Sequence, residues 1–319
     1  MQKLVLEKTA PFQGLPELVA YDEGLFAAEG LEVEFVEREH HALQSTQADI
    51  TDPQGLDPFS SHGATFEGGG ADMYNACEWG NYARVRATAR GSRQLGRRAI
   101  ITFAALVVRP DSEIYTPQQL AGKLVGLPYY FGTHYLGLLM LEGFVPRDRI
   151  RTCQAPNSSR QRYAALMSGV IEATTLTEPY ITVAEKADCR VLASAVYHGT
   201  EVAAEHVSGK TYAAFNRSVT QAVQRIKADK KRYLRYFIDY HKADPDVAAL
   251  SVDDLRASRL QVVEPGPIPE DEMSRTMEWM QSWNLLDHNA TVEALVDVER
   301  HRYSNPTKDS GVLTVHSCR

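Results

Sequence analysis

The sequence has no long apolar stretch, few cysteines and fewer basic than acidic residues. No run approaches the ~20 consecutive apolar residues that a membrane-spanning helix requires. The 34 basic and 41 acidic residues give a formal net charge of −7, which argues against a basic nucleic-acid surface. The four cysteines, Cys77, Cys153, Cys189 and Cys318, form no CxxC pair and show no disulfide-framework spacing. Scattered free or buried thiols of this kind are typical of a reducing compartment.

The first residues also lack the marks of an export signal. MQKLVLEKTAPFQGLPELVAYDEG has no charged n-region, no apolar h-region and no small-residue cleavage site. We therefore expect a cytoplasmic protein. A periplasmic or other extracytoplasmic location stays open if a signal peptide precedes Met1.

Motifs for metals, nucleotides and nucleic acids are missing as well. The ten histidines are dispersed, and the sequence has neither an HExxH motif nor a Cys/His cluster with zinc spacing. It has no P-loop, and no GxGxxG followed by an acid about 20 residues later. We expect no metal, no cofactor and no nucleic-acid partner.

The chain does carry regular α/β patterning. Its 319 residues amount to about two domains, with 44% hydrophobic and 24% charged residues. An alternating strand over residues 3–7, a helix from about Pro16 and a second strand over 31–37 form a β-α-β unit, which predicts a parallel pair. The apolar run 100–110 predicts a strand buried on both faces.

The later parts of the chain differ from each other. Residues 110–197 alternate β-α-β-α-β, with helices capped at Thr133, at Ser158 or Ser159, and at Thr177. Beyond about residue 215 the pattern is helical, including DDLRASRLQVV, and no further strand is expected. The segment 40–70 is rich in Asp, Pro, Gly and Ser; it is either a lid or binding segment or a surface insertion.

Four phrases resemble ABC-transporter substrate-binding proteins of the nitrate/taurine/alkanesulfonate class, which includes the NMT1/THI5-like proteins. They occur in the order found in that family and cover most of the chain. In sequence they are LPELVAYDEGLFAAEGLEVEFVE, GGADMYNA, IYTPQQLAGKLVGLPYYFGTHYLGLLMLEGFVPRDRI and ALMSGVIEATTLTEPYITVAEKADCRVL.

The resemblance implies an α/β, two-lobed Venus-flytrap fold with a mainly parallel sheet in each lobe. Lobe 1 comprises residues 1–107 plus 200–319, and lobe 2 residues 108–199. The hinge lies near 101–107 and 193–199. A ligand is expected in the interlobe cleft, on loops at the carboxyl ends of strands.

Two functions follow from this resemblance. The first is a small-molecule binding protein for an anionic or aromatic metabolite, with an ABC permease as partner only if the chain is exported. The second is a cytosolic enzyme on the same fold, resembling 4,5-dihydroxyphthalate decarboxylase-like lyases or thiamine-pyrimidine synthases. The missing export signal and the 40–70 segment keep the enzyme open, with cleft His and Glu side chains as acid and base.

The loops that follow the strands supply the candidate ligand contacts. Phe12 offers a ring and Gln13 a polar edge after the first strand. In YYFGTH, a strand end meets a helix start, whose free N–H groups favour an anion. The candidates in that loop are Tyr129, Tyr130, Thr133 and His134, and His134 is also a candidate general base.

The remaining candidates lie after later strands. Asn75, Cys77 and Trp79 are candidate contacts in NACEWGNY, and Glu78 is a candidate base or a helix N-terminal acid. Glu178 in TEPY and Tyr197 near the predicted hinge complete the ligand set. His40 and His41 follow the second strand, and at most one of the two is expected to face a ligand, because neighbouring side chains of a strand point to opposite faces.

Overall fold

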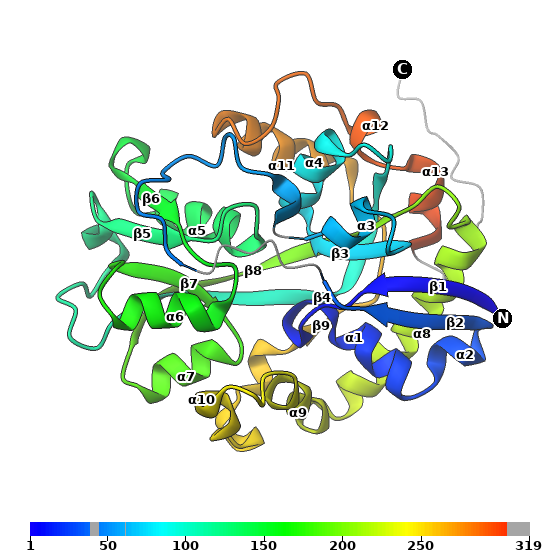
Figure 1. Ribbon diagram of the computed structural model, residues 1–319, viewed down its shortest axis with the longest axis horizontal. Coiled ribbons are helices and arrows are strands. Elements are labelled where there is room, and N and C mark those ends of the chain that lie inside the picture. Colours follow the sequence, from blue (N-terminus) through cyan, green and yellow to red (C-terminus); the bar gives the residue numbers. More distant parts are fainter. Residues whose placement is uncertain (39–44, 61, 305–319) are drawn as a thin grey trace.

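The computed structural model describes residues 1–38, 45–60 and 62–304. A nine-stranded mixed sheet has the order β2-β1-β3-β8-β4-β7-β5-β6, and β9 pairs with β4 at one side (Figure 1). The strands are β1 Gln2–Glu7, β2 Leu31–Val36, β3 Met73–Cys77, β4 Arg93–Val108, β5 Leu124–Leu127, β6 Arg151–Gln154, β7 Ala173–Thr177, β8 Arg190–Ala203 and β9 Gln261–Val262.

Helices cover both faces of this sheet (Figure 1). Among the described residues, no helix is both long and apolar enough to cross a membrane. The helices are α1 Pro11–Asp22, α2 Leu25–Ala28, α3 Ala64–Glu67, α4 Glu78–Ala87, α5 Gly132–Glu142, α6 Ser159–Met167, α7 Tyr180–Lys186, α8 Gly209–Ala228, α9 Lys230–Tyr240, α10 Pro245–Ala248, α11 Glu270–Ser282, α12 Val292–Leu295 and α13 Val298–His301.

The two ends of the sheet form two lobes. Strands β1, β2 and β3 belong to the first lobe, and β5, β6 and β7 to the second. Strands β4 and β8 are antiparallel to each other and pass from one lobe to the other. The predicted two-lobed α/β fold is confirmed, while the residue boundaries of the lobes and hinge stay predictions.

The β-α-β unit at the start of the chain agrees with the sequence pattern. Strands β1 and β2 pair in parallel from Gln2↔Leu31 to Glu7↔Val36. Helix α1 begins five residues before Pro16, and Gly14 interrupts it with φ −123°. A Cβ at Gly14 would lie 2.1 Å from the Thr9 hydroxyl oxygen, so this kink requires glycine.

Two predicted helix caps are wrong. Helix α5 begins at Gly132 with Phe131 as its N-cap, so Thr133 lies inside the first turn. Helix α7 has Pro179 as its N-cap, because Thr177 is still paired with Ala104 in the β4–β7 ladder. Ser158 does occupy the N-cap position of α6.

The predicted helix over DDLRASRLQVV is also wrong. Residues Val252–Asp254 and Ala257–Arg259 form short 3-10 turns, and the chain then enters β9. The Asp254 carboxylate accepts hydrogen bonds from the Ser251 amide and hydroxyl, which closes a single turn. Since β9 pairs with β4 at Ile100↔Val262, the helical last third does contain a strand.

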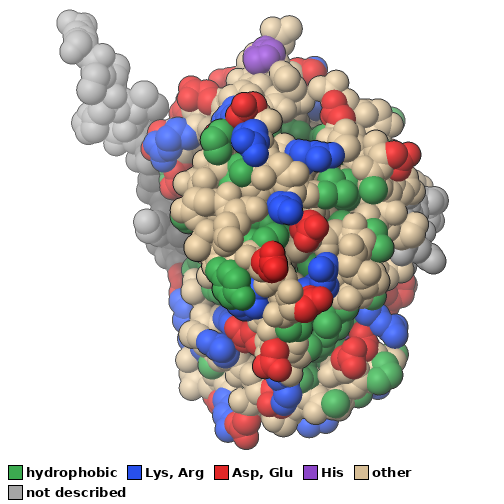
Figure 2. Space-filling view, turned by 90° about the vertical axis from the view of Figure 1, so that its left-hand side faces the viewer, with side chains coloured by type: hydrophobic (Ala, Val, Ile, Leu, Met, Phe, Trp, Pro, Cys, Tyr) green, Lys and Arg blue, Asp and Glu red, His purple; other side chains and the backbone are tan. Residues whose placement is uncertain are grey.

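Two hydrophobic clusters pack on the two faces of the sheet. The residues of β4 alternate between them, with Ala105 and Val107 in one and Ala104 and Leu106 in the other. The first cluster includes side chains of α1, α8 and α9, and the second includes those of α4, α5 and α11. At the end of the second lobe, acidic and basic side chains are interspersed with small apolar groups (Figure 2).

Candidate functional site: a cleft between the lobes

A cleft of about 620 Å³ lies between the lobes. It opens where β1 and β2 end on one side and where α5, α6 and α7 begin on the other. This volume suits a small organic molecule. The lining residues are Lys8, Ala10, Phe12, Gln13, Glu37, Arg38, Ser60, Phe131, Thr133, Asn157, Ser158, Ser159, Arg160, Gln161, Arg162, Thr177, Glu178, Tyr180, Tyr240 and His241.

The second-lobe wall is built from the first turns of two helices. Thr133 lies in the first turn of α5 and is only 2% exposed. Its hydroxyl has no hydrogen-bond partner. Ser158 and Ser159 stand at the start of α6. Unsatisfied N–H groups at helix starts carry partial positive charge, so this wall favours an anion.

A buried guanidinium holds the second wall in place. Arg162 donates hydrogen bonds of 2.7–2.9 Å to the carbonyl oxygens of Pro156, Asn157 and Thr175, and to the Ser159 hydroxyl. Burial lowers the pKa of Arg162 to about 9, so it stays charged at neutral pH. The loop before α6 is thereby fixed to β7.

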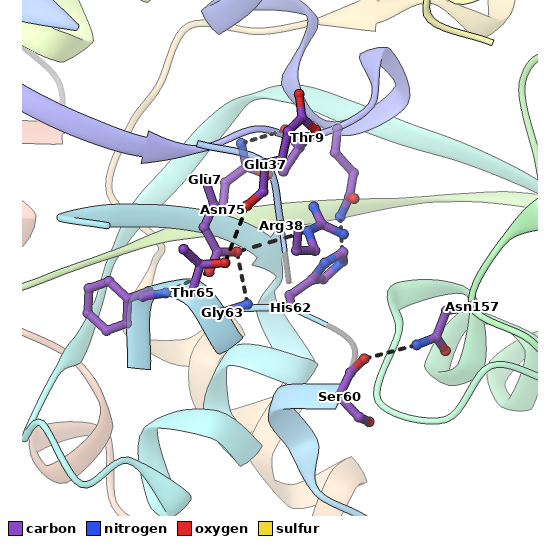
Figure 3. A network of polar contacts seen from close by, with 12 residues as sticks. Glu7, Thr9, Glu37, Arg38, Ser60, His62, Gly63, Thr65, Asn75 and Asn157 are labelled. Carbon is purple, nitrogen blue, oxygen red and sulfur yellow. Dashed lines mark hydrogen bonds and ion pairs between the residues drawn. The ribbon is translucent and has the colours of Figure 1, made fainter. Parts of the chain in front are cut away.

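The first-lobe wall carries a second guanidinium. Arg38 follows β2 with a side chain 14% exposed, and its Nε lies 3.9 Å from a Glu7 carboxylate oxygen (Figure 3). That Nε has no hydrogen-bond partner. Burial lowers the pKa of Arg38, with Glu7 opposing the shift. Glu7 also accepts hydrogen bonds from the amides of Gly63 and Phe66, at 3.0 and 2.8 Å.

His62 contacts one lining residue of each wall, Gln13 and Phe131. Its Nε2 lies 3.3 Å from Gln13 Nε2, and its ring centroid lies 4.4 Å from that of Phe131. Burial, with a smaller effect of Arg38 and Arg84, holds the pKa of His62 well below its ordinary value. His62 is therefore neutral and supports the positions of Gln13 and Phe131.

The acidic residues of the cleft already have partners. Glu178 accepts from Arg259 at 2.8 Å and from the Thr182 hydroxyl at 2.9 Å. Glu37 accepts from Lys8 at 2.8 Å. Within residues 1–38, 45–60 and 62–304, no group of three His, Cys, Asp or Glu side chains is placed to hold a metal ion.

Comparison with solved structures identifies the fold. The alkanesulfonate-binding protein SsuA from Xanthomonas axonopodis pv. citri, bound to MOPS, superposes with a TM-score of 0.67 over 92% of this chain and 97% of its own, at 15% identity. The periplasmic aliphatic sulphonate binding protein SsuA from Escherichia coli gives 0.65 over 93% and 97%, at 14% identity. The desulfurization enzyme DSZB gives 0.62 over 94% and 98%, at 16% identity.

The chain has the periplasmic-binding-protein fold. Neither a scan against protein-family models nor a search of curated proteins gives a match. The likeness therefore concerns the fold, and the NMT1/THI5-like subclass stays a prediction. In this fold the cleft described above lies between the lobes, where the sequence analysis expected the ligand.

Four predicted ligand residues line the cleft: Phe12, Gln13, Thr133 and Glu178. Each lies in a loop or helix start that follows a strand; for Glu178 the prediction also rested on the family resemblance, and for Thr133 on its place at a helix start. Arg38, Arg162 and His62 were missed. The strand-end signal applied to Arg38 as well, whereas nothing in the sequence pattern distinguished Arg162 or His62.

Other predicted residues of the YYFGTH loop lie outside the cleft lining. The Tyr129 hydroxyl lies 3.0 Å from that of Thr152, and the Tyr130 hydroxyl donates to the Pro53 carbonyl at 3.1 Å. His134 is 1% exposed and packs against Tyr129. Burial lowers the pKa of His134 to about 3, so it is neutral and its position does not favour a cation or general base here.

The NACEWGNY residues also pack away from the cleft. The Asn75 amide donates to Glu17 at 3.1 Å, and the Cys77 sulfur caps α4 by accepting from the Gly80 amide at 3.2 Å. The Trp79 ring contacts those of Tyr135, Tyr197 and Trp279.

Glu78 and Tyr197 are buried too. Glu78 accepts from the Tyr82 hydroxyl at 3.0 Å, and burial raises its pKa to about 7. Tyr197 lies against Gly132, and the Arg98 Cζ lies over its ring, 5.7 Å from the ring centroid. The remaining candidates, His40 and His41, lie outside the described residues.

Proposed function

We propose that this chain is a solute-binding protein that holds a small organic anion, such as a sulfonate, in the cleft between its lobes. The observation that carries the proposal is that one residue of each cleft wall has a donor without a hydrogen-bond partner. Thr133 supplies a buried hydroxyl at the start of α5, and Arg38 supplies a charged guanidinium from the other wall. Charge-assisted hydrogen bonds to an oxyanion satisfy both groups.

The acid–base pattern of the cleft supports an anion over a cation. Glu178 and Glu37 are committed to Arg259 and Lys8, so neither leaves a free carboxylate for an ammonium group. Removing a buried donor from water costs free energy unless it gains an acceptor. A bound oxyanion would supply a hydrogen-bond acceptor to Arg38, whose Nε has only the 3.9 Å ion pair with Glu7, and to the Thr133 hydroxyl.

Rings at the same cleft suit the apolar part of the ligand. Phe12 and Phe131 line it from the two lobes, and Tyr240 lines it from α9. Such rings contact an aromatic or aliphatic group through dispersion and burial of apolar surface. The neighbour from Xanthomonas holds MOPS, which combines a sulfonate with an organic ring.

The two candidate catalytic residues that the structure describes, His134 and Glu78, do not line this cleft. His134 and Glu78 are buried elsewhere, and the His62 ring is neutral. We therefore propose binding without turnover, rather than a lyase-like reaction. The periplasmic neighbour from Escherichia coli favours the extracytoplasmic alternative over the cytoplasmic one, and with it delivery to an ABC permease.

A ligand panel tests this proposal. Thermal unfolding is followed with MOPS, benzenesulfonate, benzoate, sulfate and the neutral compound benzenesulfonamide, and native mass spectrometry reports any co-purified molecule. We expect an organic anion to raise the melting temperature, because a ligand that binds only the folded state stabilises it. A rise with benzenesulfonamide alone, or with none of the anions, contradicts the proposal.

A further inference from the structure

The segment 45–60 contacts both lobes: it bonds to the second lobe along its length and, at Pro58, to Arg84 of the first. It follows β2, runs beside β6 and α5, and returns to α3 (Figure 1). The Gln47 amide donates to the Gln154 carbonyl at 2.9 Å, and the Gln154 amide donates to the Ile50 carbonyl at 2.8 Å. These two bonds attach the segment to the end of β6, the outermost strand of the second lobe.

Two side chains of the second lobe hold the same segment. The Tyr130 hydroxyl donates to the Pro53 carbonyl at 3.1 Å, and the Asn157 amide donates to the Ser60 carbonyl at 3.1 Å. Ser60 and Asn157 both line the cleft, so their bond joins its two sides. Tyr130 has φ 63°, a left-handed conformation that is uncommon for a bulky residue.

The returning chain is anchored to the first lobe. The carboxylate of Glu7, at the end of β1, accepts hydrogen bonds from the backbone amides of Gly63 and Phe66; its bond with Gly63 is drawn in Figure 3. The Phe66 ring is fully buried and lies 5.1 Å from that of Tyr74 in β3. The segment therefore bonds to the second lobe along its length, while the chain that continues from it is fixed to the first.

A single buried arginine joins all three parts. Arg84 lies on α4 of the first lobe and is fully buried. Its Nε donates to the Pro58 carbonyl at 3.1 Å, and one Nη donates to the Tyr130 carbonyl at 3.0 Å. The other Nη donates to Asn81 of its own helix at 3.1 Å. One planar guanidinium thus ties α4 to the segment and to the second-lobe loop before α5.

We propose that residues 45–60 are a permanent strap that, together with Arg84, holds the two lobes closed in the absence of ligand. Separating the lobes on this side breaks the bond from Arg84 to Tyr130, and with it either the bond from Arg84 to Pro58 or the bonds that hold the segment to the second lobe. Ligand exchange then takes place on the opposite side, beside α9 and α6, where Tyr240, His241 and Arg160 line the cleft. This inference concerns the closure of the lobes and does not depend on which ligand binds.

Small-angle scattering and amide hydrogen exchange on the ligand-free chain test the strap. The test variant carries Tyr130→Phe and Asn157→Ala, which remove two strap bonds and leave Arg84 in place. Tyr21→Phe, on an exposed tyrosine of the first lobe, is the matched control. Circular dichroism establishes that each variant is folded.

We expect a larger radius of gyration and about tenfold faster exchange of the Gln47 and Gln154 amides in the double variant. The β1–β2 amides keep their wild-type rates. Arg84→Lys, which loses the forked geometry, has a larger effect if it folds. Unchanged scattering and exchange in the double variant overturn the strap, and so does a wild-type Gln154 amide that exchanges as fast as exposed loop amides.

Discussion

The two walls of the cleft achieve complementarity to an anion in different ways. The second-lobe wall consists of helix starts whose positions depend on Arg162 and its four oxygen acceptors. The first-lobe wall relies on the charge of Arg38, which is only loosely paired with Glu7. One wall therefore supplies fixed geometry and the other supplies charge, so substitutions in the two walls should have different consequences.

Replacing Arg162, which supports the second-lobe wall, should have the largest effect on stability. Arg162→Gln leaves buried carbonyl oxygens without donors, and we expect a loss of about 3–5 kcal/mol in the free energy of unfolding. Urea denaturation measures this. Arg235→Gln, whose exposed side chain pairs with Asp239, is the control and should change stability by less than about 0.5 kcal/mol. Equal effects of the two variants would show that Arg162 supports nothing.

A pH experiment addresses the helix that carries the first wall. Burial raises the pKa of Glu17 in α1 to about 7, against 4.5 in the unfolded chain. The folded state therefore holds a proton that the unfolded state releases, so stability falls as pH rises from about 4.5 to 7. Glu17→Gln should remove this loss and be more stable than wild type by about 3 kcal/mol at pH 8.5.

The effect of Glu17 on stability should depend on pH. Below about pH 4 the Glu17 carboxyl is largely protonated in both the folded and the unfolded chain. The stability advantage of the variant should therefore disappear there. Glu201, whose pKa burial and Glu17 raise, acts in the same direction. Unfolding curves at pH 4 and 8.5 that show the same difference between wild type and variant would contradict the buried, protonated carboxyl.

The charge of the first wall should govern affinity more than stability. Arg38→Gln is expected to weaken benzenesulfonate binding by about 10- to 100-fold, the range of a hydrogen bond to a charged group. It should also reduce the salt dependence of binding. Lys8→Gln is the contrast, because Lys8 is already paired with Glu37 and its loss should change the Kd by less than about threefold. A larger loss of affinity in Lys8→Gln than in Arg38→Gln would indicate that the anion does not bind at Arg38.

The smallest effect on ligand affinity is expected for Thr133 of the second-lobe wall. Thr133→Val removes a hydroxyl of nearly the same volume and should weaken binding about fivefold, by roughly 1 kcal/mol. Stability should stay the same or rise, since the hydroxyl has no partner without ligand. Calorimetry and urea denaturation together separate the two quantities. A loss of stability with unchanged affinity would assign Thr133 to the core.

Strand positions could be predicted because each strand is marked by a local pattern. The alternation of LEVEFVE and the apolar run ending near Pro110 predicted β2 and most of β4. The ends of three other strands, β1, β5 and β7, precede Phe12 and Gln13, Thr133, and Glu178, which line the cleft. The same signal also selected Asn75, Cys77 and Trp79, which pack away from the cleft.

The facing of individual side chains could not be predicted in the same way. Helix α5 is buried on almost all sides, so its sequence does not show that Thr133 faces the cleft while His134 faces the core. The Arg38–Glu7 pair joins the ends of two strands, and Arg84 bonds to Pro58 and Tyr130 across 26 and 46 residues. Contacts of this range depend on the folded arrangement rather than on any local pattern.

Calorimetric titration of the wild-type chain with benzenesulfonate and benzenesulfonamide tests the central claim most directly. The two ligands share ring and shape and differ in charge. We predict one benzenesulfonate bound per chain and at least tenfold weaker binding of the sulfonamide, because only the sulfonate offers Arg38 and Thr133 a charged acceptor. Equal affinity for the two ligands would contradict an anion site in this cleft.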